Sequence, residues 1–203
     1  MSSLPYSQSC ENNKAAIAAI LKDSFSQSTQ VLEIGSGTGQ HAVHFAKLLP
    51  HLTWQTSDQL AYHTGINAWI TAEPNTNLCS PLELDVLHPW PISQLTTPLI
   101  DAIFTANTLH IMSKPMVEQF FIGAGKHLAI SGQLCIYGPF NYRGEYSSES
   151  NRNFDAWLGQ RDPQSAIRDF EWIAQLASEQ GLRLVADFSM PANNRLLHFE
   201  ETD

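Results

Sequence analysis

Short apolar runs alternate with stretches whose apolar residues recur at helical spacing along most of the chain. The runs that predict strands are 31–34, 52–56, 82–86, 99–106, 132–137, 182–188 and 195–199. The stretches that predict helices are 14–21, 40–49, 62–72, 116–128 and 166–180. Strands and helices that alternate at this rhythm form βαβ units. The pattern therefore predicts an α/β fold with a seven-stranded, mostly parallel sheet and helices on both faces.

Two segments in the last third of the chain depart from this rhythm. Residues 140–165 are polar, rich in Asn, Arg, Ser, Tyr and Gly, and follow the carboxyl end of a predicted strand. A connection of this length inside a compact domain predicts a lid or a substrate wall. The segment 190–194, Met-Pro-Ala-Asn-Asn, is too short to hold a crossover helix. The last strand is therefore predicted to run antiparallel.

Composition and charge narrow the class of protein. The chain has 203 residues, of which 43% are hydrophobic and 15% charged, as expected for one folded domain over residues 1–203. Its net charge is −9, and no basic stripe interrupts the acidic balance. Binding of nucleic acid phosphates is therefore not expected.

Location and metal content are predicted from what the sequence lacks. Cys10, Cys79 and Cys135 form no C-x-x-C pair, which indicates reduced thiols. The sequence shows no secretory leader and no apolar run long enough for a bilayer, so we expect a cytoplasmic protein without a membrane partner. His41 and His44 have the spacing of metal ligands, but no third ligand matches, and no metal is expected. A monomer or a homodimer is expected.

Three glycines at alternate positions follow the first predicted strand, at Gly35, Gly37 and Gly39. Such a turn lets the backbone approach a ligand closely and is typical of nucleotide binding. The dinucleotide fingerprint places its third glycine one residue later, and a pyrophosphate disfavours a nearby anion. Glu33, two residues before the first glycine, suits a ligand with ammonium and sulfonium groups.

This segment resembles the first motif of the class I S-adenosylmethionine-dependent methyltransferases. The resemblance implies a Rossmann-like fold, S-adenosylmethionine as methyl donor and S-adenosylhomocysteine as product. Asp58 ends the second strand, where a carboxylate can accept from both ribose hydroxyls. Asp85 and the amide of Val86 resemble the motif that holds adenine. The further residues expected at the donor are Ser36, His41 and Asn107.

No pattern in the sequence names the methyl acceptor. The candidates to orient or deprotonate it are His110, Tyr137 and Tyr142. His110 is either a proton acceptor or a structural histidine beside apolar residues. A small molecule is expected, because the chain has neither a basic surface nor an added substrate domain.

From end to end, the chain also resembles a family of small methyltransferase-like proteins with no assigned substrate. The matching segments include 36–45, 137–140, 168–169 and 190–194, while Asn12 stands where a basic residue is expected. These polar groups either line the acceptor pocket or tie the lid through a buried network. The positions expected at the acceptor are Asn13, Lys14, Phe140, Arg168, Asn193 and Asn194.

Two other functions share part of this pattern. An NAD- or NADP-dependent oxidoreductase would share Gly35, Gly37 and Asp58, but the third glycine is misplaced for it and no Tyr-x-x-x-Lys pair occurs. A catalytically silent sensor or partner protein that binds S-adenosylmethionine or S-adenosylhomocysteine would share every donor motif. We expect a methyltransferase that acts on an unidentified small molecule, with the sensor as the main alternative.

Overall fold

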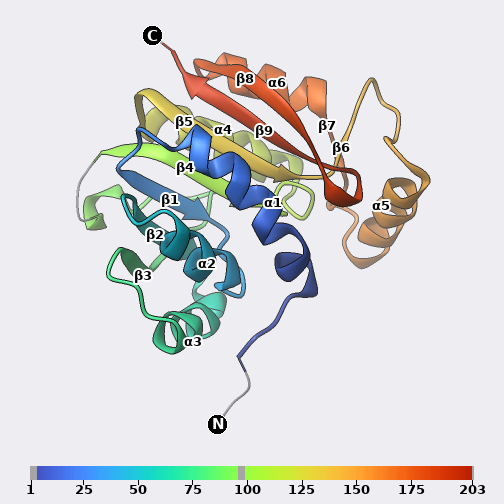
Figure 1. Cartoon of the computed structure of the whole chain (residues 1–203). Helices are drawn as coiled ribbons and strands as arrows, with labels where there is room; N and C mark the ends of the chain where they lie inside the picture. The colour runs from blue at the N-terminus through green and yellow to red at the C-terminus, as the bar shows by residue number, and fades with distance from the viewer. Residues whose placement is uncertain (1–3, 96–98, 203) are drawn as a thin grey trace.

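The computed structural model describes residues 4–95 and 99–202, which form a seven-stranded sheet in the order β3-β2-β1-β4-β5-β9-β8 (Figure 1). Neighbouring strands are parallel from β3 to β5, whereas β9 runs antiparallel to both β5 and β8. The predicted Rossmann-like sheet with an antiparallel last strand is confirmed. The strands are β1 (Gln30–Ile34), β2 (Thr53–Asp58), β3 (Leu78–Glu83), β4 (Ile100–Ala106), β5 (Leu128–Gly138), β8 (Leu182–Met190) and β9 (Asn194–Glu201).

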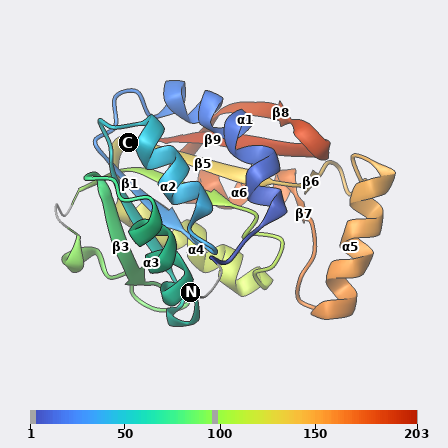
Figure 2. The same cartoon turned by 60° about the horizontal axis from the view of Figure 1, so that its bottom comes forward.

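Helices cover both faces of this sheet, as predicted (Figures 1 and 2). One face carries α1 (Gln8–Ser24), α2 (Gln40–Leu48) and α3 (His63–Ala72), and the other carries α4 (Lys114–His127) and α6 (Phe170–Glu179). Short 3-10 turns are Leu60–Tyr62, Ile92–Gln94 and Pro191–Asn193. Within the described residues, none of the helices has the length and apolar character needed to cross a membrane.

The helix α5 (Glu149–Arg161) lies apart from both faces. It stands beyond one end of the sheet, near a separate pair of short strands, β6 (Phe140–Asn141) and β7 (Arg168–Asp169) (Figures 1 and 2). The Ser148 hydroxyl caps its first turn by accepting from the backbone N–H of Asn151. The predicted lid segment 140–165 thus contains a helix that the sequence pattern did not indicate.

Strand β4 shows how the sequence divides the core in two. Ile103 packs with the side chains of α4 and α6, and Phe104 packs with those of α1 and α2. Both are fully buried, because successive side chains of a strand point to opposite faces of the sheet. The carboxyl ends of the parallel strands meet at one edge, where Ala106 of β4 pairs with Tyr137 of β5. Ligands of open α/β sheets bind at this edge.

Several predicted boundaries were wrong, and β3 and β5 each begin four residues before their predicted starts, at Leu78 and Leu128. The third strand ends at Glu83, whereas the apolar run continues, because Leu84 and Val86 belong to the loop that follows and are buried there. Helix α1 begins at Gln8 under a Ser7 cap, six residues before its predicted start. Helix α6 starts at Phe170, because residues 166–169 are used for strand β7 and for contacts with a neighbouring loop.

Candidate functional site

The three glycines of the turn after β1 all have positive φ, but the space around each of them differs. A Cβ on Gly35 (φ +75°) would lie 2.6 Å from Cγ2 of Thr108, so this glycine allows the turn to pack on the loop after β4. A Cβ on Gly39 (φ +91°) would lie 3.0 Å from Cα of Ile66, so this glycine allows α2 to pack on α3. A Cβ on Gly37 (φ +59°) would meet nothing within 4 Å. Gly37 is therefore the glycine that keeps space open.

Glu33 lies behind this turn and not on its open side. Its side chain is buried, and its Oε2 accepts from the Ser36 hydroxyl at 2.9 Å and from the Trp54 indole N–H at 3.0 Å. Burial raises the pKa of the Glu33 carboxyl from 4.5 to about 7, against the lowering effect of these two hydrogen bonds. Glu33 lines none of the cavities described below, so its contacts position the turn.

This buried carboxyl predicts a pH-dependent stability. The folded chain holds the Glu33 proton more tightly than the unfolded chain, so the free energy of unfolding falls as pH rises from about 4.5 to about 7. Glu33→Gln keeps a neutral acceptor for both donors. Between about pH 5 and about pH 8, the free energy of unfolding of this variant is expected to fall by roughly 2 kcal/mol less than that of the wild type. Urea unfolding at both pH values measures it. Glu83→Gln, at an exposed carboxylate, is the control, and an unchanged pH dependence in Glu33→Gln would contradict the assignment.

Two cavities meet at the carboxyl edge of the sheet, on either side of this turn. The first has a volume of about 660 Å³ and the second about 340 Å³. Gly35, Gly37 and Asn107 line both, so the cavities adjoin along the glycine turn and the end of β4.

The second cavity brings together three predicted donor residues from two strand ends, Asp58, Asp85 and Val86. The Asp58 carboxylate accepts from the backbone N–H of Gly37 and from that of Gln59, each at 2.7 Å. Burial raises the pKa of the Asp58 carboxyl, while the amide hydrogen bonds oppose the rise. A carboxylate has about four acceptor positions, so Asp58 keeps capacity for two ligand hydroxyls.

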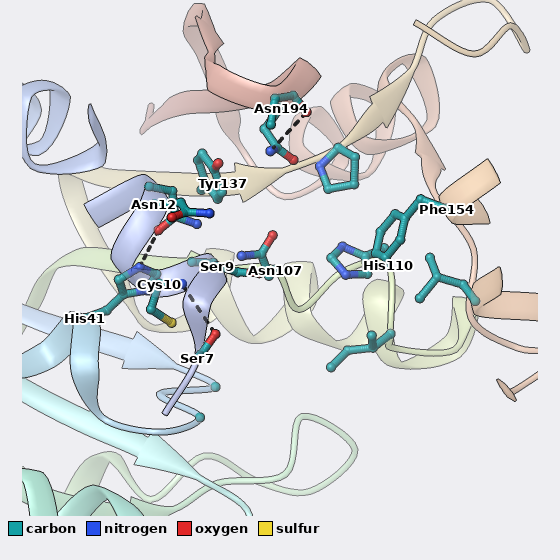
Figure 3. A pocket seen from close by; sticks show the side chains of 18 of the residues that line it. Ser7, Ser9, Cys10, Asn12, His41, Asn107, His110, Tyr137, Phe154 and Asn194 are labelled. Atoms are coloured by element: carbon teal, nitrogen blue, oxygen red, sulfur yellow. Dashed lines mark hydrogen bonds between the residues drawn. The ribbon is translucent and has the colours of Figure 1, made fainter. Parts of the chain in front are cut away.

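The first cavity holds a row of polar groups near α1. Asn13 Oδ1 and His41 Nε2 lie 2.7 Å apart, and because an amide oxygen only accepts, the imidazole N–H donates. Burial lowers the pKa of His41 to about 4, so the ring is neutral at physiological pH. Asn13 and Asn194 also interact with the Tyr137 phenol, whose pKa is raised by burial. These four residues come from α1, α2, β5 and β9 and all line the first cavity, and Figure 3 labels His41, Tyr137 and Asn194 among them.

His110 lies on the other side of Asn107 in the same cavity (Figure 3). Burial, and secondarily the positive charge of Arg168, lower the pKa of the imidazole to about 4. Its ring meets the edge of Phe154 from α5, with centroids 5.3 Å apart. The imidazole of His110 is thus neutral at physiological pH.

Asn107 follows β4 in the left-handed backbone region, with φ +59°. Asparagine tolerates this region better than most residues, although it still carries strain. Its backbone N–H donates to the carbonyl of Tyr137 at 2.8 Å, which ties the ends of β4 and β5 together. The side chain lines the first cavity, between Tyr137 and His110 (Figure 3).

Several predicted site residues line neither of these two cavities. Lys14 forms an ion pair with Glu11 at 2.6 Å, and Phe140 is buried in the core. Burial raises the pKa of the Tyr142 phenol, and the hydrogen bond that its hydroxyl donates to Asp187 at 2.7 Å raises it further. The residues outside both cavities are Lys14, Glu33, Gly39, Phe140, Tyr142, Arg168 and Asn193.

A third cavity of about 460 Å³ contains two of these residues, Tyr142 and Asn193. Asn194 lines both the first and the third cavity. The structure therefore does not bring Tyr142 together with His110 and Tyr137.

Arg168 is buried and contacts backbone rather than a cavity. Its guanidinium donates to the carbonyls of Leu109, Met112 and Gln164. The backbone N–H of Ala166 also donates to the carbonyl of His110, at 3.0 Å. Residues 164–168 therefore hold the loop 107–112, and with it His110, against the lid segment.

Helix α5 supplies one wall of the first cavity, which the sequence pattern did not predict. Its cavity-lining residues recur at helical spacing and so share one helical face. This spacing was the available signal, but the segment looked like a polar loop because few of its residues are buried in the core. The lining residues of α5 are Ser150, Asn151, Phe154, Trp157, Leu158 and Arg161.

The start of α1 supplies further lining residues that were not predicted, among them Ser7 and Cys10 (Figure 3).

Among the described residues, no three His, Cys, Asp or Glu side chains converge in a way that could hold a metal ion.

Comparisons with known proteins agree with this architecture. An O-methyltransferase family protein from Burkholderia thailandensis matches 94% of this chain and 56% of its own, with 15% identity and a TM-score of 0.81. An O-methyltransferase family 2 protein from Planctomyces limnophilus, in complex with apigenin, matches 96% and 58%, with 15% identity and a TM-score of 0.82. Human N-acetylserotonin methyltransferase, in complex with SAM, matches 94% and 56%, with 12% identity and a TM-score of 0.70.

These similarities show the class I methyltransferase fold, and the chain spans a little over half the length of the structures that it matches. A family profile described as protein of unknown function (DUF938) matches residues 4–201. The match covers nearly the whole chain, and the chain therefore belongs to the DUF938 family.

Proposed function

We propose that the chain is a methyltransferase that takes its methyl group from S-adenosylmethionine and transfers it to a small-molecule acceptor. The second cavity would hold the adenosine half of the donor, with Asp58 toward the ribose hydroxyls and Asp85 and Val86 toward the adenine. Gly35, Gly37, Ser36, His41 and Asn107 would surround the methionine half in the first cavity.

The observation that carries this proposal is the position of Gly37. It lines both cavities, its missing side chain leaves open space, and its amide is bound to the carboxylate of Asp58. A ligand that occupied both cavities would lie along the turn that carries this residue. A nucleoside joined to an amino acid chain has the required shape, with hydroxyls at one end and a charged polar group at the other.

S-adenosylmethionine supplies a methyl group already activated by its positively charged sulfur. The chain's own residues then need to align the acceptor and exclude water, and alignment can contribute on the order of 7–11 kcal/mol. Asn107 lines both cavities, and Tyr137 and His110 line the first, where the acceptor would lie (Figure 3). If the acceptor is a hydroxyl, neutral His110 would receive its proton.

This role predicts that His110→Asn slows methyl transfer to a hydroxyl acceptor by about a hundredfold or more and leaves the affinity for S-adenosylhomocysteine unchanged. The assay incubates protein with methyl-labelled S-adenosylmethionine and a small-metabolite extract and follows labelled products by chromatography. His51→Asn, at an exposed histidine before β2, is the control and should keep wild-type rates. Equal rates in His110→Asn would remove His110 from the proposal.

The same assay separates the proposal from a silent sensor. A methyltransferase gives a labelled product with the wild-type protein. Donor binding without any labelled product, across extracts from several growth conditions, would favour the sensor instead.

A further inference from the structure

One face of α5 carries aromatic side chains that the protein core does not cover. Phe154 and Trp157 are stacked, with centroids 5.7 Å apart and an interplanar angle of 20°, and both line the first cavity. Trp157 is 46% exposed. Large aromatic side chains exposed within a concave site are typical of ligand binding.

This aromatic surface has a different polar group at each end. At one end the His110 ring meets Phe154, with centroids 5.3 Å apart. At the other end the Arg161 guanidinium lies over the Trp157 ring, 4.6 Å from its centroid. Four side chains thus form a row in the order His110, Phe154, Trp157, Arg161, with a neutral proton acceptor at one end and a cation at the other.

The charge of the cavity is opposite to that of the protein as a whole. The net charge of the chain is −9, yet among the described lining residues Arg161 is the one Asp, Glu, Lys or Arg side chain. Arg161 makes no ion pair within the described ranges 4–95 and 99–202. The carboxylate of Asp155, also on α5, is turned to Tyr146 and to the backbone N–H of Ile167. The cavity therefore offers an anion a partner without a competing carboxylate.

We infer that the acceptor is a planar aromatic molecule with an anionic group, such as a carboxylate, at one end and a hydroxyl at the other. This inference rests on the proposed methyltransferase function. The aromatic body would stack along Phe154 and Trp157, and the anion would pair with Arg161. The hydroxyl would then face His110, between the α5 wall and the glycine turn.

The transfer step follows from this placement. The acceptor hydroxyl gives its proton to the neutral imidazole of His110, and its oxygen forms a bond to the methyl carbon. The bond between that carbon and sulfur breaks, and its electron pair stays on sulfur, which becomes an uncharged thioether. One methyl group moves, one proton is held by His110, and no oxidant or reductant is required.

The test uses the wild-type protein saturated with S-adenosylhomocysteine and calorimetric titration of four probes. These are caffeate, hydroxynaphthoate and the uncharged amide of each. The acids are expected to bind at least about tenfold tighter than their amides, because a hydrogen bond to a charged partner is stronger than one to a neutral group. Arg161→Gln is expected to remove that preference and to leave binding of S-adenosylhomocysteine unchanged.

Arg152→Gln is the matched control. Arg152 is also an exposed arginine of α5 that lies over an aromatic ring, that of Tyr146, but it lines none of the three cavities. This variant should keep the wild-type preference for the acids. Thermal unfolding of both variants checks that α5 remains folded.

Three results would overturn the inference alone while S-adenosylhomocysteine still binds. They are acids that bind no tighter than their amides, acids that bind more weakly than about 1 mM, and a preference that survives in Arg161→Gln. Loss of S-adenosylhomocysteine affinity in Arg161→Gln would also overturn it, since Arg161 would then serve the donor. Failure of the wild-type protein to bind S-adenosylhomocysteine would instead refute the proposed function and the inference with it.

Discussion

Gly37→Val is expected to lower the affinity for S-adenosylhomocysteine by at least about a hundredfold while the chain remains folded. The valine side chain would enter open space that both cavities share, which is where the donor is proposed to cross the turn. At φ +59° a side chain also strains the backbone, by roughly 1–2 kcal/mol. Calorimetric titration measures the affinity, and urea unfolding measures the stability.

Gly144→Val separates these two effects. Gly144 also has a positive φ, +73°, and a Cβ there also meets nothing within 4 Å, but Gly144 lines none of the three cavities. Both variants should lose similar stability, and the loss of binding should occur in Gly37→Val alone. Wild-type affinity in a folded Gly37→Val protein would show that the donor does not cross this turn.

Arg168→Met is expected to reduce the free energy of unfolding by roughly 3–5 kcal/mol. Methionine fills much of the same volume, but the carbonyls of Leu109, Met112 and Gln164 would lose the donor that now satisfies them. Relief of the buried charge offsets part of this loss. Urea unfolding of the variant against the wild type measures the difference.

Arg183→Met is the control for this substitution. Arg183 is an exposed arginine paired with Glu200, and its removal should cost less than about 1 kcal/mol. The two arginines also differ in their effect on His110, whose pKa is lowered in part by Arg168. Titration of the His110 ring by NMR should therefore show a higher pKa in Arg168→Met and no change in Arg183→Met. Equal stabilities of the two variants would contradict the role of Arg168 in holding the loop 107–112.

The predicted order of strands and helices was confirmed because buried parallel strands impose continuous apolar runs on the sequence. The short segment 190–194 likewise forced the last strand to reverse, and β9 does so. The run 82–86 was misplaced because burial alone does not distinguish a strand from a loop pressed on the core, as Leu84 and Val86 are. A run of apolar residues indicates that the segment is buried. It does not by itself indicate that the backbone forms the hydrogen bonds of a strand.

The site was less accessible to sequence reasoning, because a side chain's direction depends on its neighbours in space. Glu33 and Asp58 are both carboxylates at strand ends, yet Glu33 turns back to Trp54 and Asp58 faces the second cavity. Arg168 and Arg161 differ in the same way, since one is bound to backbone carbonyls and the other lines the first cavity. Residue type identified groups that could act, and the tertiary contacts decided which of them reach the cavities.

The most direct test of the account is calorimetric titration of the wild-type protein with S-adenosylmethionine, S-adenosylhomocysteine, NAD and NADPH. A single site that binds both adenosyl compounds, with no heat from either nicotinamide cofactor, is the predicted result. Binding of NAD or NADPH without binding of either adenosyl compound would contradict the central claim and assign the glycine turn to a dinucleotide.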